Sequence, residues 1–210
     1  MLSNILIRQY KSCDSSSVRD LFRDGWESYR DPPHLYEDVM NFSQSTLERD
    51  MANIEKHYLE VEGGNFWVAE EAVDGKHNRI VGCVGVTPLK PEDTTDASLK
   101  SYELVRMSIH VDFRCKGLGR KLVEHLQDFV KDNCGDEVVL FTCNEMTAAC
   151  KFYEAIGFAR VGGLELFTVK EAWPKAVVDG TLHIQRFEKS LHMKHLDNLR
   201  HKKLKNLGNI

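Results

Sequence analysis

The amino-acid sequence predicts an α/β domain in which helices flank a mixed β-sheet. Period-2 alternation over residues 102–111 leads directly into a glycine-bearing turn and then into an amphipathic helix. Upstream of this stretch, two strand-like segments are separated by a short polar connection, which is typical of a hairpin. Downstream of it, strands and helices alternate as in β-α-β units. Hairpins followed by β-α-β units predict a sheet with both antiparallel and parallel neighbours.

Length and composition suit one domain with a short extension. The chain has 210 residues, of which 42% are hydrophobic and 29% are charged, and its net charge is −4. We expect a single domain over residues 1–191 with a helical insert at about 31–62, followed by a basic tail over 192–210. No apolar run approaches the ~20 residues of a membrane span. Because the first ten residues also lack a secretory signal, we expect no membrane partner and a cytoplasmic location, with the nucleus as the open alternative.

The cysteines and histidines are arranged in no pattern that binds metal. The six cysteines are scattered and form no C-x-x-C pair. The nine histidines form no H-E-x-x-H motif and no spaced pair with cysteines. We therefore expect reduced thiols and no metal ion.

The N-terminal half should contain a strand, helices and a hairpin. Residues 4–9 alternate as a short strand, and residues 14–29 follow as a helix. From 34 to 62 the sequence predicts one or two helices, broken near 41–45, where Ser43 or Ser45 could cap the second. Residues 65–72 and 79–89 are expected to form the hairpin. The apolar stripe expected on the first helix consists of Val18, Leu21, Phe22 and Trp26.

The C-terminal half follows the β-α-β pattern. Apolar residues at helical spacing from Leu118 to Val130 predict a helix after the glycine turn. The remaining segments expected are a buried strand at 137–143, a helix at 144–156, and strands at 158–161, 164–169 and 181–187. In the central strand, alternation places Glu103 on the same face as Val105, Met107 and Ile109.

The glycine turn has the features of an anion site. It begins a helix, whose first N–H groups lack intrahelical partners and carry partial positive charge. Three basic residues surround it: Arg114, Lys116 and Arg120. A P-loop would need Gly-Lys-Ser/Thr, and a dinucleotide fingerprint would need a third glycine where this chain has Leu122. The remaining alternatives are a different phosphate-containing ligand, or a turn that only starts a helix.

Two motifs in order resemble one known family. The spacing Arg114-x-x-Gly117-x-Gly119 after a long strand resembles the pyrophosphate-binding segment of the GCN5-related N-acetyltransferases. A second run is similar to the family's other coenzyme A segment: Ala149-x-x-Phe152-Tyr153-x-x-x-Gly157-Phe158. The resemblance spans roughly residues 4–191. It implies the mixed-sheet fold of that family, transfer of an acetyl group from acetyl-CoA to a primary amine, and no metal.

The resemblance also implies which residues contact the cosubstrate. Backbone amides of the turn would hold the pyrophosphate, and the central strand, splayed from its neighbour, would bond the pantetheine arm. The residues so implied are Met107, Ser108, Ile109, Arg114, Cys115, Lys116, Gly117, Leu118, Gly119, Arg120, Asn144, Ala149, Phe152 and Tyr153. The chain departs from the family where Met146 replaces a frequent Asn, and Asn144 lies two residues earlier.

Acetyl transfer needs a base for the amine and an acid for the departing thiolate. The resemblance assigns the acid to Tyr153; from the residue alone, a buried core aromatic is equally consistent. For the base we predict Glu103, with His110 as the alternative and a solvated strand-end glutamate as the non-functional interpretation. Direct attack in a ternary complex is expected, whereas Cys143 and Cys150 leave an acetyl-enzyme open.

The acceptor is open between small amines, amino acids and protein amines. Acidic residues within 26–62 would attract a cationic amine or would form a solvated helix face; they are Glu27, Asp31, Glu37, Asp38, Glu48 and Asp50. Two non-enzymatic alternatives remain: a domain that binds acyl-CoA without catalysis, and binding of nucleic acid or another anionic partner by the basic tail. The tail lacks interleaved aromatics and the chain is net acidic, which disfavours nucleic acid. We expect the tail to pack on the domain or on a second subunit, so a homodimer is open.

Overall fold

The computed structural model describes residues 4–28, 36–73, 77–90, 94, 96–163 and 184–191. The strands within these residues are β1 Ile5–Gln9, β2 Asn65–Val73, β3 His77–Pro88, β4 Ser101–Ile109, β5 Glu137–Cys143, β6 Ala159–Gly163 and β7 Ile184–Ser190. The α-helices are α1 Ser15–Glu27, α2 Tyr36–Glu48, α3 Leu118–Asp132 and α4 Thr147–Ala155. A 3₁₀ turn, Asp50–Ala52, and a π-helical turn, Glu55–Leu59, follow α2.

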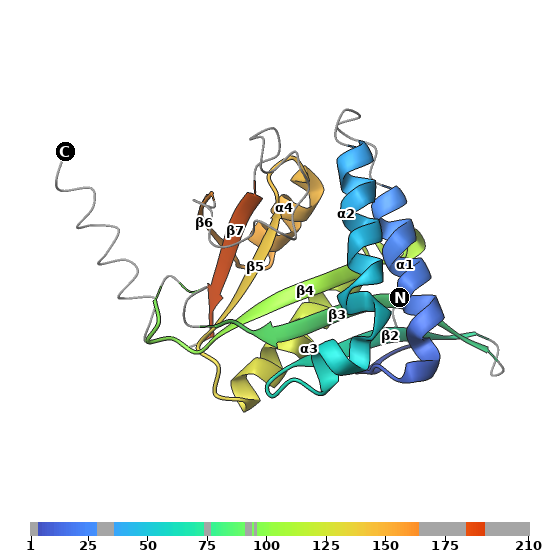
Figure 1. The fold of residues 1–210 in the computed structure, drawn as a ribbon, viewed down its shortest axis with the longest axis horizontal. Helices are drawn as coiled ribbons and strands as arrows, with labels where there is room; N and C mark the ends of the chain where they lie inside the picture. Colours follow the sequence, from blue (N-terminus) through green and yellow to red (C-terminus); the bar gives the residue numbers. More distant parts are fainter. Residues whose placement is uncertain are drawn as a thin grey trace.

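The described strands form one mixed sheet in the order β1-β2-β3-β4-β5-β7-β6. Strands β1 to β4 are antiparallel neighbours, β4 and β5 are parallel, and β7 lies antiparallel between β5 and β6. Helix α3 makes the crossover that a parallel pair requires. The predicted mixed sheet, with hairpins first and β-α-β units second, is confirmed (Figure 1).

Helices cover both faces of the sheet and enclose two apolar clusters. On one face, the α1-side cluster contains Phe22 of α1, Tyr58 of the π-helical turn and Phe66 of β2. On the other face, the larger α3-side cluster contains Leu122, Leu126 and Tyr153 of α3 and α4, which are buried because the α3 stripe faces the sheet. Helix α2 lies beside α1 (Figure 1).

The predicted break near residues 41–45 is wrong, because α2 continues to Glu48. Ser43 and Thr46 are buried rather than capping a helix start. The end of the helix is set by α1: Nη1 of Arg19 donates to the carbonyls of Leu47, at 2.7 Å, and Met51, at 3.0 Å. Those carbonyls lack intrahelical partners, so a donor from another helix stabilises the end at this point.

Other boundaries differ from the sequence-based ones by a few residues. The strand predicted at 137–143 is confirmed as β5. Helix α4 begins at Thr147 rather than 144, and β7 ends at Ser190 rather than 187. The strand predicted at 164–169 and the basic tail at 192–210 lie outside the described residues. Within the described part, every helix is too short or too polar to cross a membrane.

Candidate active site

The two parallel strands diverge where the site forms. β4 and β5 pair only through Ser101, Tyr102 and Glu103, opposite Glu137, Val138 and Val139. β4 continues to Ile109 and β5 to Cys143 without further pairing between them. Figure 1 shows the two strands moving apart. The backbone groups of the diverging halves can therefore accept a ligand that adds to the sheet edge. The divergence expected from the family resemblance is confirmed.

The glycine turn lies at the mouth of this divergence. Gly117 has a φ of 87° and precedes the first residue of α3. Cys115 also has a positive φ, 57°, so two residues of the turn adopt the left-handed conformation. A Cβ added at Gly119 would lie 3.0 Å from Cε of Met107 and 3.1 Å from Cζ of Phe152, so the turn, β4 and α4 meet here. The structure thus brings together the segments predicted to bind one ligand.

The basic residues of the turn already have protein contacts. Nε of Arg114 donates to the carbonyl of Ile109 at 3.1 Å, and its Nη2 donates to Oγ of Ser28 at 2.9 Å. Arg120 donates to the carbonyl of Ala155, and Lys116 lies 5.8 Å from the Phe113 ring. Their side chains are exposed, so they surround the turn with positive charge without filling it.

A cavity of about 590 Å³ occupies the space between the diverging strands and the α1–α2 pair. Of the residues predicted from sequence, Glu103, Met107, Ala149 and Tyr153 line it. The predicted residues that lie outside its lining are Ser108, Ile109, Arg114, Cys115, Lys116, Gly117, Leu118, Gly119, Arg120, Asn144 and Phe152. Oδ1 of Asn144 accepts a hydrogen bond from Arg160 at 2.9 Å. The set therefore divides into a cavity group, a group at the end of β4 and around the turn, and Asn144, which bonds Arg160.

Tyr153 lines the cavity with a side chain that is almost fully buried. The residue is 9% exposed, and its hydroxyl lies 3.8 Å from Sδ of Met107. The ring packs against Phe158, 5.8 Å away, and Phe187, 5.9 Å away. Burial, together with the Cys150 thiol, raises the pKa of Tyr153 well above that of a free phenol. The hydroxyl therefore keeps its proton at neutral pH.

A β-bulge in β4 changes which residues face the cavity. Val105 pairs with Gly85 and Ser108 with Cys83, so Arg106 and Met107 together oppose one residue of β3, Val84. Arg106 has the left-handed φ of 53°. As a result, Val105 packs with the α1-side cluster, whereas Met107 and Ile109 pack with the α3-side cluster. The prediction that Glu103 shares a face with Met107 and Ile109 is wrong, because the bulge reverses the alternation.

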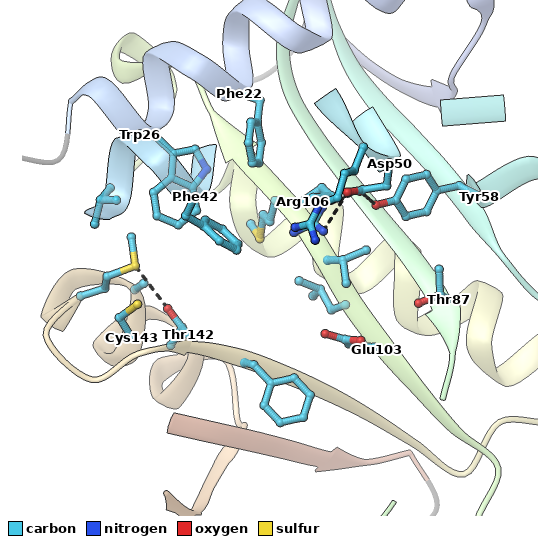
Figure 2. Close-up of a pocket in the computed structure, with 18 of the residues that line it drawn as sticks. Phe22, Trp26, Phe42, Asp50, Tyr58, Thr87, Glu103, Arg106, Thr142 and Cys143 are labelled. Carbon is cyan, nitrogen blue, oxygen red and sulfur yellow. Dashed lines mark hydrogen bonds and ion pairs between the residues drawn. The ribbon is translucent and has the colours of Figure 1, made fainter. Parts of the chain in front are cut away.

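The sequence analysis missed Arg106 and Tyr58 in the cavity wall, and it missed their pairing with Asp50. Arg106 donates from Nε to Oδ2 of Asp50 at 2.6 Å and from Nη2 to Oδ1 at 3.0 Å. Tyr58 donates its hydroxyl to the same carboxylate (Figure 2). Asp50 belonged to the acidic set expected to attract an amine, but its partner lies on a strand fifty-six residues away. No local pattern signals such a pair.

The arrangement shifts the pKa values of all three groups. Burial alone would raise the pKa of Asp50, but the charge and hydrogen bonds of Arg106 outweigh it and hold that pKa below its ordinary value. Burial raises the pKa of Tyr58, and the neighbouring carboxylate adds to the shift. For Arg106, burial lowers the pKa, but the surrounding negative charge more than compensates. Asp50 is thus a poor base and a fixed anchor for Arg106.

Replacing Asp50 with Asn is expected to lower the free energy of unfolding by about 2–4 kcal/mol, because it leaves the partly buried Arg106 charge without its partner. Asp50 has a lowered pKa when folded, so its stabilisation is present above the ordinary carboxyl pKa and is lost as pH falls through the folded value. Urea unfolding at pH 7 and at pH 3 measures both effects. Asp20→Asn, which breaks an exposed pair with Arg23, is the control and should change stability by under ~0.5 kcal/mol. If the two variants had the same urea midpoint of unfolding at pH 7, the stabilising role of the Asp50–Arg106 pair would be contradicted.

Residues 62–160 match the family model of an acetyltransferase (GNAT) domain. The matched segment contains the diverging strands, the glycine turn, α3 and α4. The chain belongs to the GCN5-related N-acetyltransferase (GNAT) family.

Two curated relatives illustrate what this GNAT chain is similar to. The probable N-acetyltransferase camello of Xenopus tropicalis is 36% identical over 145 residues, which cover 69% of this chain and 58% of the relative. The N-acetylaspartate synthetase of Danio rerio is 34% identical over 131 residues, which cover 62% of this chain and 42% of the relative. The chain therefore spans about half the length of these curated relatives.

Solved GNAT structures share the fold at low sequence identity. A GNAT acetyltransferase from Staphylococcus aureus has a TM-score of 0.64 and 21% identity, over 90% of this chain and 99% of that one. An acetyltransferase from Salmonella typhimurium, solved with its cofactor acetyl-CoA, has a TM-score of 0.55 and 16% identity, over 91% and 96% of the two chains. The predicted GNAT-like fold is confirmed.

Proposed function

We propose that this GNAT protein is an N-acetyltransferase that moves the acetyl group of acetyl-CoA to a primary amine. The observation that carries the proposal is the cavity between the diverging strands, which has Tyr153 on one wall and Glu103 on another. The Salmonella typhimurium structure, which holds acetyl-CoA, supports the choice of cosubstrate. The Danio rerio relative, named for N-acetylaspartate, supports an amine acceptor.

The cosubstrate would lie along the sheet edge from the turn to the cavity. The pyrophosphate would take the amides of residues 114–120, where the α3 N-terminus and exposed basic side chains attract an anion. The pantetheine arm would bond the main chain of Met107, Ser108 and Ile109, which β5 leaves unpaired. Ala149 lines the cavity and would contact the thiol end, whereas Phe152 packs beside the turn and would contact the arm nearer the pyrophosphate. Asn144 could donate its amide nitrogen, and its oxygen already accepts one hydrogen bond, from Arg160.

The transfer would proceed by direct attack of the amine on the thioester. Glu103 would take the proton of the amine, and Tyr153 would give its proton to the departing thiolate. An acetyl-cysteine intermediate is disfavoured by the surroundings of the two nearby thiols. Burial raises the pKa of Cys143 to about 12 and also raises that of Cys150, so neither forms the nucleophilic thiolate at neutral pH.

The proposal includes the extent of the catalytic unit. Residues 1–191 would form one acetyltransferase domain, in which the helical insert at about 31–62 supplies a wall of the acceptor side. Val39, Phe42 and Asp50 of that insert line the cavity, which supports this role. Packing of the basic tail on the domain or on a second subunit, a homodimer and a cytoplasmic location stay predictions from the sequence.

The deciding experiment measures free coenzyme A released from acetyl-CoA in the presence of small amines, amino acids and lysine peptides. We expect release that depends on one amine class, with the acetylated amine identified by mass. Stabilisation of the protein by acetyl-CoA without any release would favour the alternative of a binding domain. Neither release nor stabilisation would contradict the proposed coenzyme site.

A further inference from the structure

Among the residues that the structure describes, the charged side chains that line the acceptor side of the cavity are balanced in sign. They are Arg49, Asp50, Glu103 and Arg106. Among the acidic residues of the insert region whose side chains the structure describes, only Asp50 reaches the cavity, and Arg106 neutralises it. A pocket for a polyamine or a lysine side chain would carry excess negative charge. A balanced lining instead suits an acceptor that carries both signs.

We propose that the acceptor is a free α-amino acid with a large apolar side chain, whose carboxylate binds Arg106 while its amine lies at Glu103. This inference rests on the proposed acetyl transfer and names its substrate class. Three features of the cavity support the proposal: the guanidinium of Arg106, the carboxylate of Glu103 on the same strand, and a wall of aromatic rings.

Arg106 is held in place by Asp50 and can still donate to a ligand. Nε and Nη2 donate to Asp50, and Tyr58, which holds that carboxylate, also interacts with the guanidinium. Nη1 does not bond Asp50, so it can donate to a ligand carboxylate, which the planar group suits. The left-handed backbone at the bulge brings the side chain to the cavity wall. A donor already fixed in position binds without losing further side-chain entropy.

Glu103 lies close enough to complement the amine. It is on the same strand as Arg106, its charge acts on the guanidinium, and both side chains line the cavity. In an α-amino acid the ammonium and carboxylate groups are attached to one carbon, so neighbouring opposite charges in the pocket match them. Figure 2 shows Arg106 between the Asp50–Tyr58 pair and the aromatic group, with Glu103 further along β4.

Aromatic rings form the opposite wall of the cavity. Trp26 lies edge-to-face with Phe42, with centroids 5.3 Å apart, and with Phe22, at 5.9 Å. All three line the cavity, and Trp26 and Phe42 are only partly buried. Phe141 of β5 adds a fourth ring. An apolar substituent would remove this surface from water, whereas a small or acidic side chain would leave it exposed.

The first test needs no variant, because it compares matched acceptors with the wild-type protein. L-phenylalanine is compared with phenylalaninamide and phenethylamine, which keep the ring and amine but lack the carboxylate. We expect kcat/KM to be at least ~100-fold higher for phenylalanine, because a site built to bind a charged group rejects analogues that lack it. Alanine and aspartate should also be poorer acceptors than phenylalanine, because neither fills the aromatic wall.

The second test separates recognition by Arg106 from its structural role. Arg106→Gln should raise KM for phenylalanine by about 10-fold or more and leave KM for phenethylamine unchanged. If the variant instead disturbed the fold, the rates with phenylalanine and with phenethylamine would fall by the same factor. Arg79→Gln, which removes an exposed arginine paired with Glu71 away from the cavity, is the control and should change neither KM.

The outcomes distinguish this inference from the proposed function. If phenethylamine, phenylalaninamide or a lysine peptide is acetylated as well as phenylalanine, acetyl transfer stands and recognition of a carboxylate is overturned. If aspartate or alanine is preferred, the apolar side chain is overturned. If no amine is acetylated while acetyl-CoA still stabilises the protein, the proposed transfer itself fails.

Discussion

Replacing Tyr153 with phenylalanine is expected to lower kcat for acetyl transfer by ~100-fold or more, the usual contribution of a positioned acid. The hydroxyl would no longer protonate the departing thiolate, whereas the ring would keep its contacts with Phe158 and Phe187. KM for acetyl-CoA should change little, because the hydroxyl contributes one weak contact, with Met107. Initial rates of coenzyme A release at saturating substrates measure the effect.

The control for this variant is Tyr10→Phe. Tyr10 is likewise buried, at 5% exposure, but it packs on Phe66 in the α1-side cluster and does not line the cavity. It should leave kcat unchanged. Equal rates for wild type and Tyr153→Phe would show that the thiolate leaves unprotonated or takes its proton from water.

The raised pKa of Tyr153 also predicts how the rate of acetyl transfer depends on pH. An acid with a raised pKa stays protonated at higher pH, so it remains competent as pH rises. The wild-type rate should therefore rise with pH as the amine loses its proton, without a falling limb below pH ~10, the ordinary tyrosine value. A falling limb between pH 7 and 9 would contradict the role of Tyr153 as the acid.

Replacing Glu103 with glutamine is expected to lower kcat by a similar factor, ~100-fold near pH 7, because no carboxylate then accepts the proton of the amine. The deficit should shrink as pH rises, since a growing fraction of the amine arrives already deprotonated. Measuring kcat from pH 6 to 10 for both proteins tests this. Under the amino-acid proposal, KM for the acceptor should also rise, because Glu103 complements the ammonium group.

Glu124→Gln, which changes an exposed glutamate of α3, is the matched control. A parallel profile for wild type and Glu103→Gln across the whole pH range would assign the base elsewhere. His110, the alternative predicted from sequence, does not line the cavity, and its Nδ1 accepts a hydrogen bond from the amide of Asp112. Its participation would therefore require a relay of water.

The order of elements and the glycine turn that begins α3 could be predicted from sequence, because both depend on local patterns. Alternation, amphipathic periodicity and the turn around Gly117 are properties of neighbouring residues. The end of α2 could not be predicted, because Arg19 of another helix supplies the donor for its last carbonyls. The faces of β4 could not be predicted either, because the bulge at Arg106 depends on its pairing with β3.

The sequence by itself determined the GNAT motifs, the mixed sheet, and the choice of Glu103 and Tyr153 as candidates. The family resemblance implied that the two strands diverge, but only the tertiary structure located the divergence after Glu103 and showed that the helical insert lines the resulting cavity. It also decided the acceptor side, where Asp50 and Arg106 come from distant segments and convert an acidic stretch into a balanced pocket. The physical reason is that periodicity reports burial along one element, whereas charge pairing depends on which elements the fold brings within hydrogen-bond distance.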